Sequence, residues 1–396
     1  MKKLFISFIA ISLALPSIAQ RQLYLGNDNF AELRYANAAN YYIDALEAKP
    51  TLEATEKLAD CYRFLNNYGG AEKYYRKAIK YPGSSSRNYY HLGQVLKVNQ
   101  KYDEAKLVFT KYATFKGVDS LQAVELLKSC DDAKDWIAEE HNYLVRTRAD
   151  LNSRNSDFGL VMINDSTLAY TTNRKKCDVQ LSADQKRPYY KVAYSEIDDS
   201  LKAKKIRYID FESEVDYHIA TPSFTASGDT MFFTRSFIEK DTREVLNRLE
   251  LSYSVKMGNV WSTPKKLPIN FKNSSNGHPA WDAYNNKLIF ISNRKGGFGG
   301  YDLYESKLVD GKWQDAVNLG AVVNSSDDEF YPTMVENQLY FSSRGHIGLG
   351  GLDIFNTHQI NDTTWSAPMN LKTPFNSSYD DFAYSRIKDT NRGWYS

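Results

Sequence analysis

The second half of this chain contains a repeat of about 50 residues, which limits the folds open to it. Trp261, Trp313 and Trp365 lie 52 and 52 residues apart, and a leucine follows each of them six residues later. Short apolar runs separated by Gly, Asn, Asp and Ser turns fill the intervals, which indicates β-structure. Four strands per unit of this length are typical of a β-propeller blade, which buries its faces only by stacking around an axis. The repeat therefore predicts a β-propeller.

Two more markers recur inside the unit. An X-Pro motif opens the inner strand at Thr221-Pro222-Ser223-Phe224, His278-Pro279-Ala280-Trp281 and Tyr331-Pro332-Thr333-Met334. An arginine ends the next strand at Arg174, Arg235, Arg294 and Arg344. We expect these arginines to be structural, paired with acidic turn residues such as Asp302, Asp353 or the Asp327-Asp328 pair, since catalytic residues have no reason to recur in every blade. We expect the tryptophans to pack between neighbouring blades.

The repeat places complete blades at residues 155–205, 215–273, 274–325 and 326–378. A fifth unit starts at Asp380 and reaches Ser396 without its Ser-Asn-Arg marker. We therefore expect a propeller over residues 143–396 with four complete blades and a partial fifth, from a ring of six. Either the full protein is longer, or the segment near 143–150 closes the ring; we favour the first explanation.

Residues 20–142 follow a different period. Leu25, Leu58 and Leu92 lie 33 and 34 residues apart, the period of the tetratricopeptide (TPR) repeat. Small and aromatic residues occupy the other positions of that repeat: Gly26, Ala38, Tyr42, Ala45, Ala59, Tyr62, Ala71, Tyr75, Ala78, Gly93, Ala105 and Phe109. The pattern predicts a TPR-like α-solenoid, with one or two capping helices from Ser120 to Glu140. The fold class is thus multidomain, α followed by β.

TPR arrays bind peptides or protein surfaces in a concave groove lined by the first helix of each repeat. The groove positions of the second repeat are Glu53, Glu56, Asp60 and Arg63, and those of the third are Arg87, Tyr90, Gln94 and Lys97. The alternative is that these residues form only a solvated helix face.

The first nineteen residues have the pattern of a secretory signal peptide. Lys2 and Lys3 precede an apolar run from Leu4 to Leu15, and small residues at Ser17 and Ala19 suit a cleavage site. We expect an exported chain that starts at Gln20. The three cysteines, Cys61, Cys130 and Cys177, contain no Cys-x-x-Cys pair, which excludes the usual zinc and thioredoxin-like patterns. Cys61 and Cys130 fall on predicted helices, so we expect packed, free thiols.

Motifs for chemistry are missing. The sequence has no Gly-x-Ser-x-Gly elbow and no His-Glu-x-x-His helix, and its six histidines are scattered. Gly296 to Gly300 predicts a hairpin, since no Gly-Lys-Ser/Thr follows it. His218 and His278 lie where they could face the propeller channel, although a hydrogen-bonded strand-end role is favoured. The net charge of +2 gives no bulk case for nucleic acid or an anionic membrane. We expect no catalytic residues, cofactor or metal.

The Ser292-Asn293-Arg294, Gly296-Gly297 and Asp302-Leu303-Tyr304 markers resemble those of the PD40 (TolB-like, WD40-like) blade. A signal peptide, TPR repeats and PD40 blades in this order resemble the OmpA-family proteins of Bacteroidetes, which include the PorE-type component of type IX secretion. That family carries a C-terminal OmpA-like domain that binds peptidoglycan, and its members often pair with a PorP/SprF-type outer-membrane barrel. No OmpA-like segment is present in this sequence, so no peptidoglycan-binding residue can be placed on it.

The resemblance implies a periplasmic, outer-membrane-associated scaffold that docks an outer-membrane complex through its repeat groove and propeller, and anchors it to peptidoglycan through a further C-terminal domain. Two other hypotheses stay open. The propeller could be a binding module for glycan or peptide, or the chain could be a propeller-type hydrolase or lyase whose site is assembled from distant loops.

Overall fold

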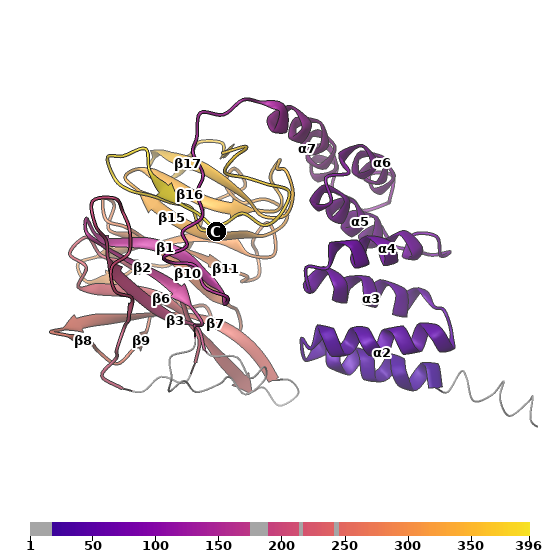
Figure 1. The fold of residues 1–396 in the computed structure, drawn as a ribbon, viewed down its shortest axis with the longest axis horizontal. Helices are drawn as coiled ribbons and strands as arrows, with labels where there is room; N and C mark the ends of the chain where they lie inside the picture. The colour runs from indigo at the N-terminus through magenta and orange to yellow at the C-terminus, as the bar shows by residue number, and fades with distance from the viewer. Residues whose placement is uncertain (1–17, 175–188, 214–216, 241–244) are drawn as a thin grey trace, which may run out of the picture. The chain divides into compact units, whose positions relative to one another are not determined.

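The computed structural model describes residues 18–174, 189–213, 217–240 and 245–396 (Figure 1). The predicted signal peptide up to residue 17, and Cys177, lie outside these ranges. The chain divides into a helical unit that ends at Ala138 and a β unit that begins at Glu139. The sequence pattern places this boundary slightly later, at residue 142. Each unit is described by itself.

The helical unit consists of helix pairs, as the TPR prediction requires. A helix over residues 18–31 is followed by α2 (Tyr35–Ala48), α3 (Leu52–Phe64), α4 (Tyr68–Ala78), α5 (Ser86–Val98), α6 (Tyr102–Tyr112) and α7 (Ser120–Ala138). A residue with positive φ turns the chain between the two helices of each repeat, at Leu33, Asn66 and Gln100. The side chains of Thr51 and Asn67 cap α3 and α4 by accepting backbone N–H groups. A single capping helix, α7, packs its residues Leu126, Cys130 and Ala133 against the array.

The small residues of the repeat have a steric reason. A Cβ atom on Gly93 of α5 would lie 2.3 Å from the ring of Phe109 on α6, and one on Gly26 would lie 2.6 Å from the ring of Tyr42. Both rings are fully buried. The two helices of a repeat therefore pack with an aromatic ring directly against a backbone, which only glycine permits at this distance.

The β unit contains four antiparallel sheets of four or five strands and a fifth sheet of two strands. In each of the four larger sheets, the first four strands lie side by side in chain order. The first sheet is β1 (Asp157–Asn164), β2 (Thr167–Thr172), β3 (Lys191–Glu196) and β4 (Arg207–Tyr208). The second is β5 (Ile219–Phe224), β6 (Thr230–Lys240), β7 (Val245–Met257), β8 (Val260–Trp261) and β9 (Lys265–Lys266). The third is β10 (Asn276–Asp282), β11 (Lys287–Ser292), β12 (Asp302–Val309), β13 (Lys312–Trp313) and β14 (Val317–Asn318). The fourth is β15 (Glu329–Val335), β16 (Gln338–Ser343), β17 (Asp353–Asn361), β18 (Thr364–Trp365) and β19 (Met369–Asn370). The fifth pair is β20 (Ser385–Arg386) and β21 (Gly393–Trp394).

The five sheets surround one axis. The first strand of each, namely β1, β5, β10, β15 and β20, contributes residues to one central pocket. Contacts join β20 both to β15 and to β1. The described strands thus place five inner strands around the axis, four from complete sheets and one from the two-stranded fifth sheet. Four complete sheets agree with the prediction, in which the last blades are truncated or missing. The chain is β-propeller in this half, in agreement with the fold prediction.

The segment after the helical unit packs beside this ring. Lys372 Nζ lies 2.9 Å from the Glu139 carboxylate, and the rings of Tyr143 and Phe375 are 4.7 Å apart. Further along, Leu151 is buried against the first sheet. These contacts place residues 139–151 beside the first sheet and beside the segment that follows the fourth sheet.

The tryptophans pack between blades, as predicted. Trp261 lies in a cluster with Ala169 and Val192 of the first sheet, and Trp365 in one with Ile289 and Leu303 of the third. Trp313 packs with residues of the second and third sheets.

The recurring arginines have structural contacts, but their partners differ from those expected. Arg174 pairs with Asp157 at 3.1 Å, and Arg235 with Glu250 at 2.6 Å. Arg294 lies over the Tyr304 ring at 4.4 Å, and Arg344 pairs with Asp380 at 3.4 Å. Asp302 instead accepts backbone N–H groups and so fixes the predicted glycine hairpin. These pairings depend on the conformation of each turn, which the repeat pattern alone does not predict.

Candidate functional site

The predicted groove residues of the helical unit centre on Asp60, which is fully buried on α3. Its carboxylate accepts hydrogen bonds from Tyr75 Oη at 2.6 Å and from an Arg87 terminal nitrogen at 2.7 Å. Arg63 lies 4.0 Å away and donates through Nε to Tyr75 Oη at 3.3 Å. Burial and the nearby Asp60 charge raise the pKa of Tyr75, so its hydroxyl stays protonated and donates. Asp60 therefore joins α3, α4 and α5 rather than facing solvent.

The two glutamates on α3 behave differently from Asp60. Glu53 is exposed and accepts a hydrogen bond from Asn27 at 3.2 Å. Glu56 is half-buried and accepts one from Asn88 of α5 at 3.0 Å. Glu53 is consequently the carboxylate of this set that offers most surface to a partner.

On α5 the predicted residues form a second stripe. Arg87 is exposed, while Tyr90 and Gln94 are half-buried and hydrogen-bonded to each other at 3.0 Å. Gln94 Oε1 has no hydrogen-bond partner among the described residues. Lys97 is buried, with 3% of its surface exposed. The structure thus brings Asp60, Arg63 and Arg87 together. Exposed surface remains on Glu53 and Arg87, partly exposed surface on Tyr90 and Gln94, and Gln94 Oε1 can still accept a hydrogen bond.

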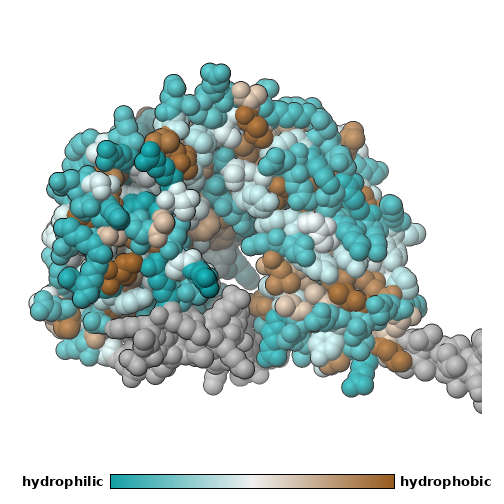
Figure 2. Space-filling view, in the orientation of Figure 1, coloured by the Kyte–Doolittle hydropathy of each residue, from teal (hydrophilic) through white to brown (hydrophobic). Residues whose placement is uncertain are grey.

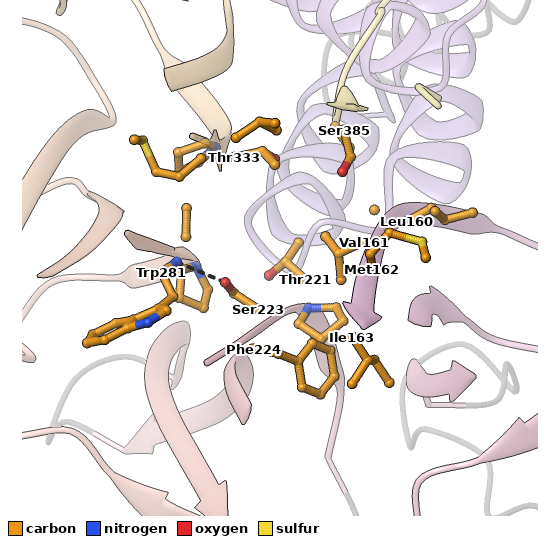
Figure 3. A pocket seen from close by; sticks show the side chains of 18 of the residues that line it. Leu160, Val161, Met162, Ile163, Thr221, Ser223, Phe224, Trp281, Thr333 and Ser385 are labelled. Atoms are coloured by element: carbon orange, nitrogen blue, oxygen red, sulfur yellow. Dashed lines mark hydrogen bonds between the residues drawn. The ribbon is translucent and has the colours of Figure 1, made fainter. Parts of the chain in front are cut away.

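The propeller has a second candidate site in its central pocket, which has a volume of about 300 Å³ (Figure 3). A bulge with a positive-φ residue recurs in the inner strands, at Gly159, Thr221, His278, Tyr331 and, beside β20, Ala383. The bulge at Thr221 is held by a hydrogen bond from its backbone N–H to Thr171 Oγ1 at 2.8 Å. Backbone strain and bulges often occur at binding sites. Here the bulges also belong to the inner strands, so they contribute to the propeller structure as well.

His278 lines this pocket but is not poised for acid–base chemistry. Its Nδ1 accepts the backbone N–H of Tyr331 at 3.2 Å, and its ring stacks on the Tyr331 ring at 4.3 Å. Burial lowers the pKa of His278 to about 3, so the ring is neutral at pH 7. His218 likewise accepts the backbone N–H of Tyr190 through Nδ1, at 3.0 Å. His218 directly precedes β5, as the strand-end prediction requires, whereas His278 lies inside β10 and lines the pocket. Both rings are hydrogen-bonded to a backbone N–H.

Sequence reasoning missed the polar groups of the pocket. Ser223, Thr333 and Ser385 line it, together with the charged residues Glu336, Arg386 and Lys388. Ser223 and Thr333 directly follow the prolines of the X-Pro markers, a position that varies between hydroxyl and alanine along the repeats. That variation within an otherwise constant marker is the signal that could have identified them.

The cysteines, the possible metal ligands, the helices and the surface of the described ranges also bear on the predictions. Cys61 and Cys130 are buried free thiols, as expected, and burial raises the pKa of Cys61 to about 12. Within residues 18–174, 189–213, 217–240 and 245–396, no cluster of three His, Cys, Asp or Glu side chains could hold a metal ion. None of the helices described has both the length and the apolar character to span a membrane. Hydrophilic side chains cover most of the surface in Figure 2, and hydrophobic residues form separate patches.

Comparison with known proteins bears most directly on the helical unit. Residues 53–83 match the tetratricopeptide repeat family model. The second TPR domain of human RPAP3, solved with an HSP70 peptide, is 25% identical; the match covers 30% of this chain and 98% of that one, with a TM-score of 0.27. A search of curated protein sequences found no match.

Structures similar to larger parts of the chain are more distant in sequence. A protein of unknown function from Dyadobacter fermentans is 13% identical, with 57% of this chain and 66% of that chain covered and a TM-score of 0.37. An α-L-arabinofuranosidase from Fusarium graminearum is 14% identical, with 56% and 68% covered and a TM-score of 0.34. The match of residues 53–83 to the tetratricopeptide repeat model and the propeller sheets of the β unit together suggest a protein-interaction scaffold.

Proposed function

We propose that this chain is a non-enzymatic scaffold whose helical unit binds a segment of a partner protein. The observation that carries the proposal is the buried Asp60 carboxylate, which bonds Arg87 and Tyr75 and so joins three helices. Glu53 lies on α3, and Tyr90 and Gln94 lie on α5, two of the helices that this carboxylate joins. A surface whose side chains are already ordered loses less entropy on binding than a flexible one.

The absence of an enzymatic role is part of the proposal. In the propeller pocket Glu336 is paired with Arg386 at 3.1 Å, and the Nδ1 atom of His278 is occupied by a backbone N–H. Both groups already have a partner, whereas a general base needs a lone pair available to the proton that it removes. These contacts favour recognition over catalysis.

The compartment and partner follow from the family resemblance alone. We propose that the scaffold works in the periplasm, where it docks an outer-membrane barrel of the PorP/SprF type or another component of type IX secretion. Anchoring to peptidoglycan would require an OmpA-like domain C-terminal to the propeller.

A capture experiment with the full chain tests the proposal. The immobilised protein is incubated with detergent-solubilised outer membranes of its own bacterium, and bound proteins are identified by mass spectrometry. We expect one barrel protein to be retained by the native chain and lost with the double variant Glu53→Lys, Gln94→Lys. The matched control is Glu47→Lys, since Glu47 is exposed on α2, outside the two stripes. Equal retention by the double variant and the control would count against the proposal.

A further inference from the structure

The charged groups of the propeller pocket carry an inference that does not depend on the helical unit. Glu336 follows β15, Arg386 belongs to β20, and Lys388 lies just beyond it; all three line the pocket. Arg386 donates from a terminal nitrogen to Glu336 at 3.1 Å. Lys388 is exposed and makes no ion pair within the described part of the chain. Two cations and one carboxylate therefore leave the pocket with an excess positive charge.

Arg386 has unused hydrogen-bonding capacity. Its Nε is buried and has no hydrogen-bond partner in the part of the protein that the structure describes. A buried donor without a partner is unfavourable, because it has given up its hydrogen bond to water. The guanidinium fork presents its N–H groups in a geometry that matches a carboxylate in bidentate fashion. A small rotation of the side chain would place Nε–H and a terminal N–H on one incoming carboxylate.

Hydroxyl groups line the same cavity. Ser385 is only 5% exposed, yet it borders the pocket, and neither it nor Thr333 has a side-chain hydrogen bond among residues 18–174, 189–213, 217–240 and 245–396. Figure 3 shows both side chains at the cavity, on β20 and β15. Ser223 Oγ accepts the Trp281 backbone N–H at 2.8 Å and keeps its own proton to donate. Three hydroxyls on three inner strands can thus bond a polar ligand.

The rest of the wall is apolar. Val161 and Ile163 of β1 and Met334 of β15 line the pocket. Methionine adapts its shape to what it contacts. A volume of about 300 Å³ lies at the lower end of the range for small-ligand sites. These dimensions suit a short aliphatic chain better than a large sugar.

We propose that the central pocket binds a carboxylate on a short apolar stem. Arg386 and Lys388 bind the carboxylate, Ser385 and Thr333 supply hydroxyl groups, and Val161, Ile163 and Met334 contact the stem. The same chemistry is found in a small aliphatic acid and in the C-terminal residue of a polypeptide with an apolar side chain.

Calorimetric titration of the full chain separates these two sources and tests the site. The probes are hexanoate and its neutral counterpart hexanamide, and acetyl-Ala-Val-Leu with either a free carboxylate or a C-terminal amide. We expect each carboxylate that binds to do so at least tenfold more tightly than its amide. Binding of hexanoate alone identifies a small acid as the ligand class, and binding of the peptide acid alone identifies a polypeptide end.

Matched variants locate the binding. Arg386→Met is expected to weaken carboxylate binding at least tenfold, and Thr333→Val a few fold. Arg392→Met is the control, because Arg392 is an exposed arginine near β21 that does not line the pocket. If Arg386→Met fails to fold, Lys388→Met replaces it, since that side chain is exposed, with a loss of threefold or more expected. The proposal is overturned if neither acid binds, if amides bind as tightly as acids, or if the pocket variant and the control behave alike.

Discussion

Arg87 on α5 donates a hydrogen bond of 2.7 Å to Asp60 on α3, across two consecutive helical repeats. Asp60 is fully buried, whereas almost half of the Arg87 side-chain surface is exposed. A buried carboxylate needs partners, because removing it from water costs several kcal/mol. The contact therefore fixes the relative position of the two repeats and places Arg87 on the surface proposed to bind a partner.

Replacing Asp60 by asparagine should destabilise the helical unit. Asp60→Asn preserves the shape but removes the charge that accepts from both Arg87 and Tyr75, so we expect a loss of about 1–3 kcal/mol in the free energy of unfolding. The measurement is urea denaturation of the full chain, followed by the helical circular dichroism signal. The control is Glu47→Gln at an exposed site. If the two variants unfold alike, Asp60 does not have the structural role described above.

Two glycines on helices should respond to alanine with opposite signs. Gly93→Ala places a Cβ atom 2.3 Å from the Phe109 ring, and we expect a loss of about 1–3 kcal/mol from overpacking. A Cβ atom on Gly69 of α4 meets nothing within 4 Å, so Gly69→Ala should gain up to about 1 kcal/mol from helix propensity. Thermal unfolding of both variants checks this. A Gly93→Ala protein as stable as the native chain would contradict the close packing.

Stability of the propeller should depend on the protonation of Glu329. Its side chain is fully buried on β15 and accepts from Ser325 Oγ at 2.5 Å and Ser343 Oγ at 2.8 Å. Burial raises its pKa from 4.5 to about 8. The folded chain therefore holds a proton at neutral pH that the unfolded chain has released. This contribution is fully present below pH 4.5 and is lost as the pH rises toward 8.

The variant Glu329→Gln isolates this effect. Glutamine cannot ionise, so from pH 5 to pH 8 the native chain should lose about 1–3 kcal/mol of stability relative to the variant. Burial also raises the pKa of Asp381 to about 6, and that contribution of the same sign cancels in the comparison. Urea denaturation at both pH values measures the difference. A constant difference between the two proteins would show that Glu329 does not retain its proton in the fold.

The sequence predicts local structure better than contacts between distant segments. Leu58-Ala59 and Leu92-Gly93 reveal the helical repeats because the packing of each pair is local and periodic. The equal spacing of Trp261 and Trp313 reveals the blades for the same reason. The contact of β20 with β1, by contrast, joins residues more than 200 positions apart, and no periodic signal reports it.

The candidate sites show the same limit. Helix periodicity places Asp60 of α3 and Arg87 of α5 at groove positions of the array. It does not predict that Asp60 is buried and hydrogen-bonded to Tyr75 of a third helix, α4. In the propeller, the markers locate Thr333 on an inner strand. That Thr333 and Arg386 line the same pocket emerges only when the fifth pair of strands joins the ring.

Site-specific photo-crosslinking in living cells tests whether the helical unit binds a partner protein. Tyr90→p-benzoylphenylalanine in the full-length protein places the crosslinker on the α5 stripe, and the same replacement at Glu47 serves as control. The scaffold account predicts one defined covalent adduct with an outer-membrane protein from position 90 and none from position 47. No adduct at position 90, or the same adducts at both positions, would contradict it.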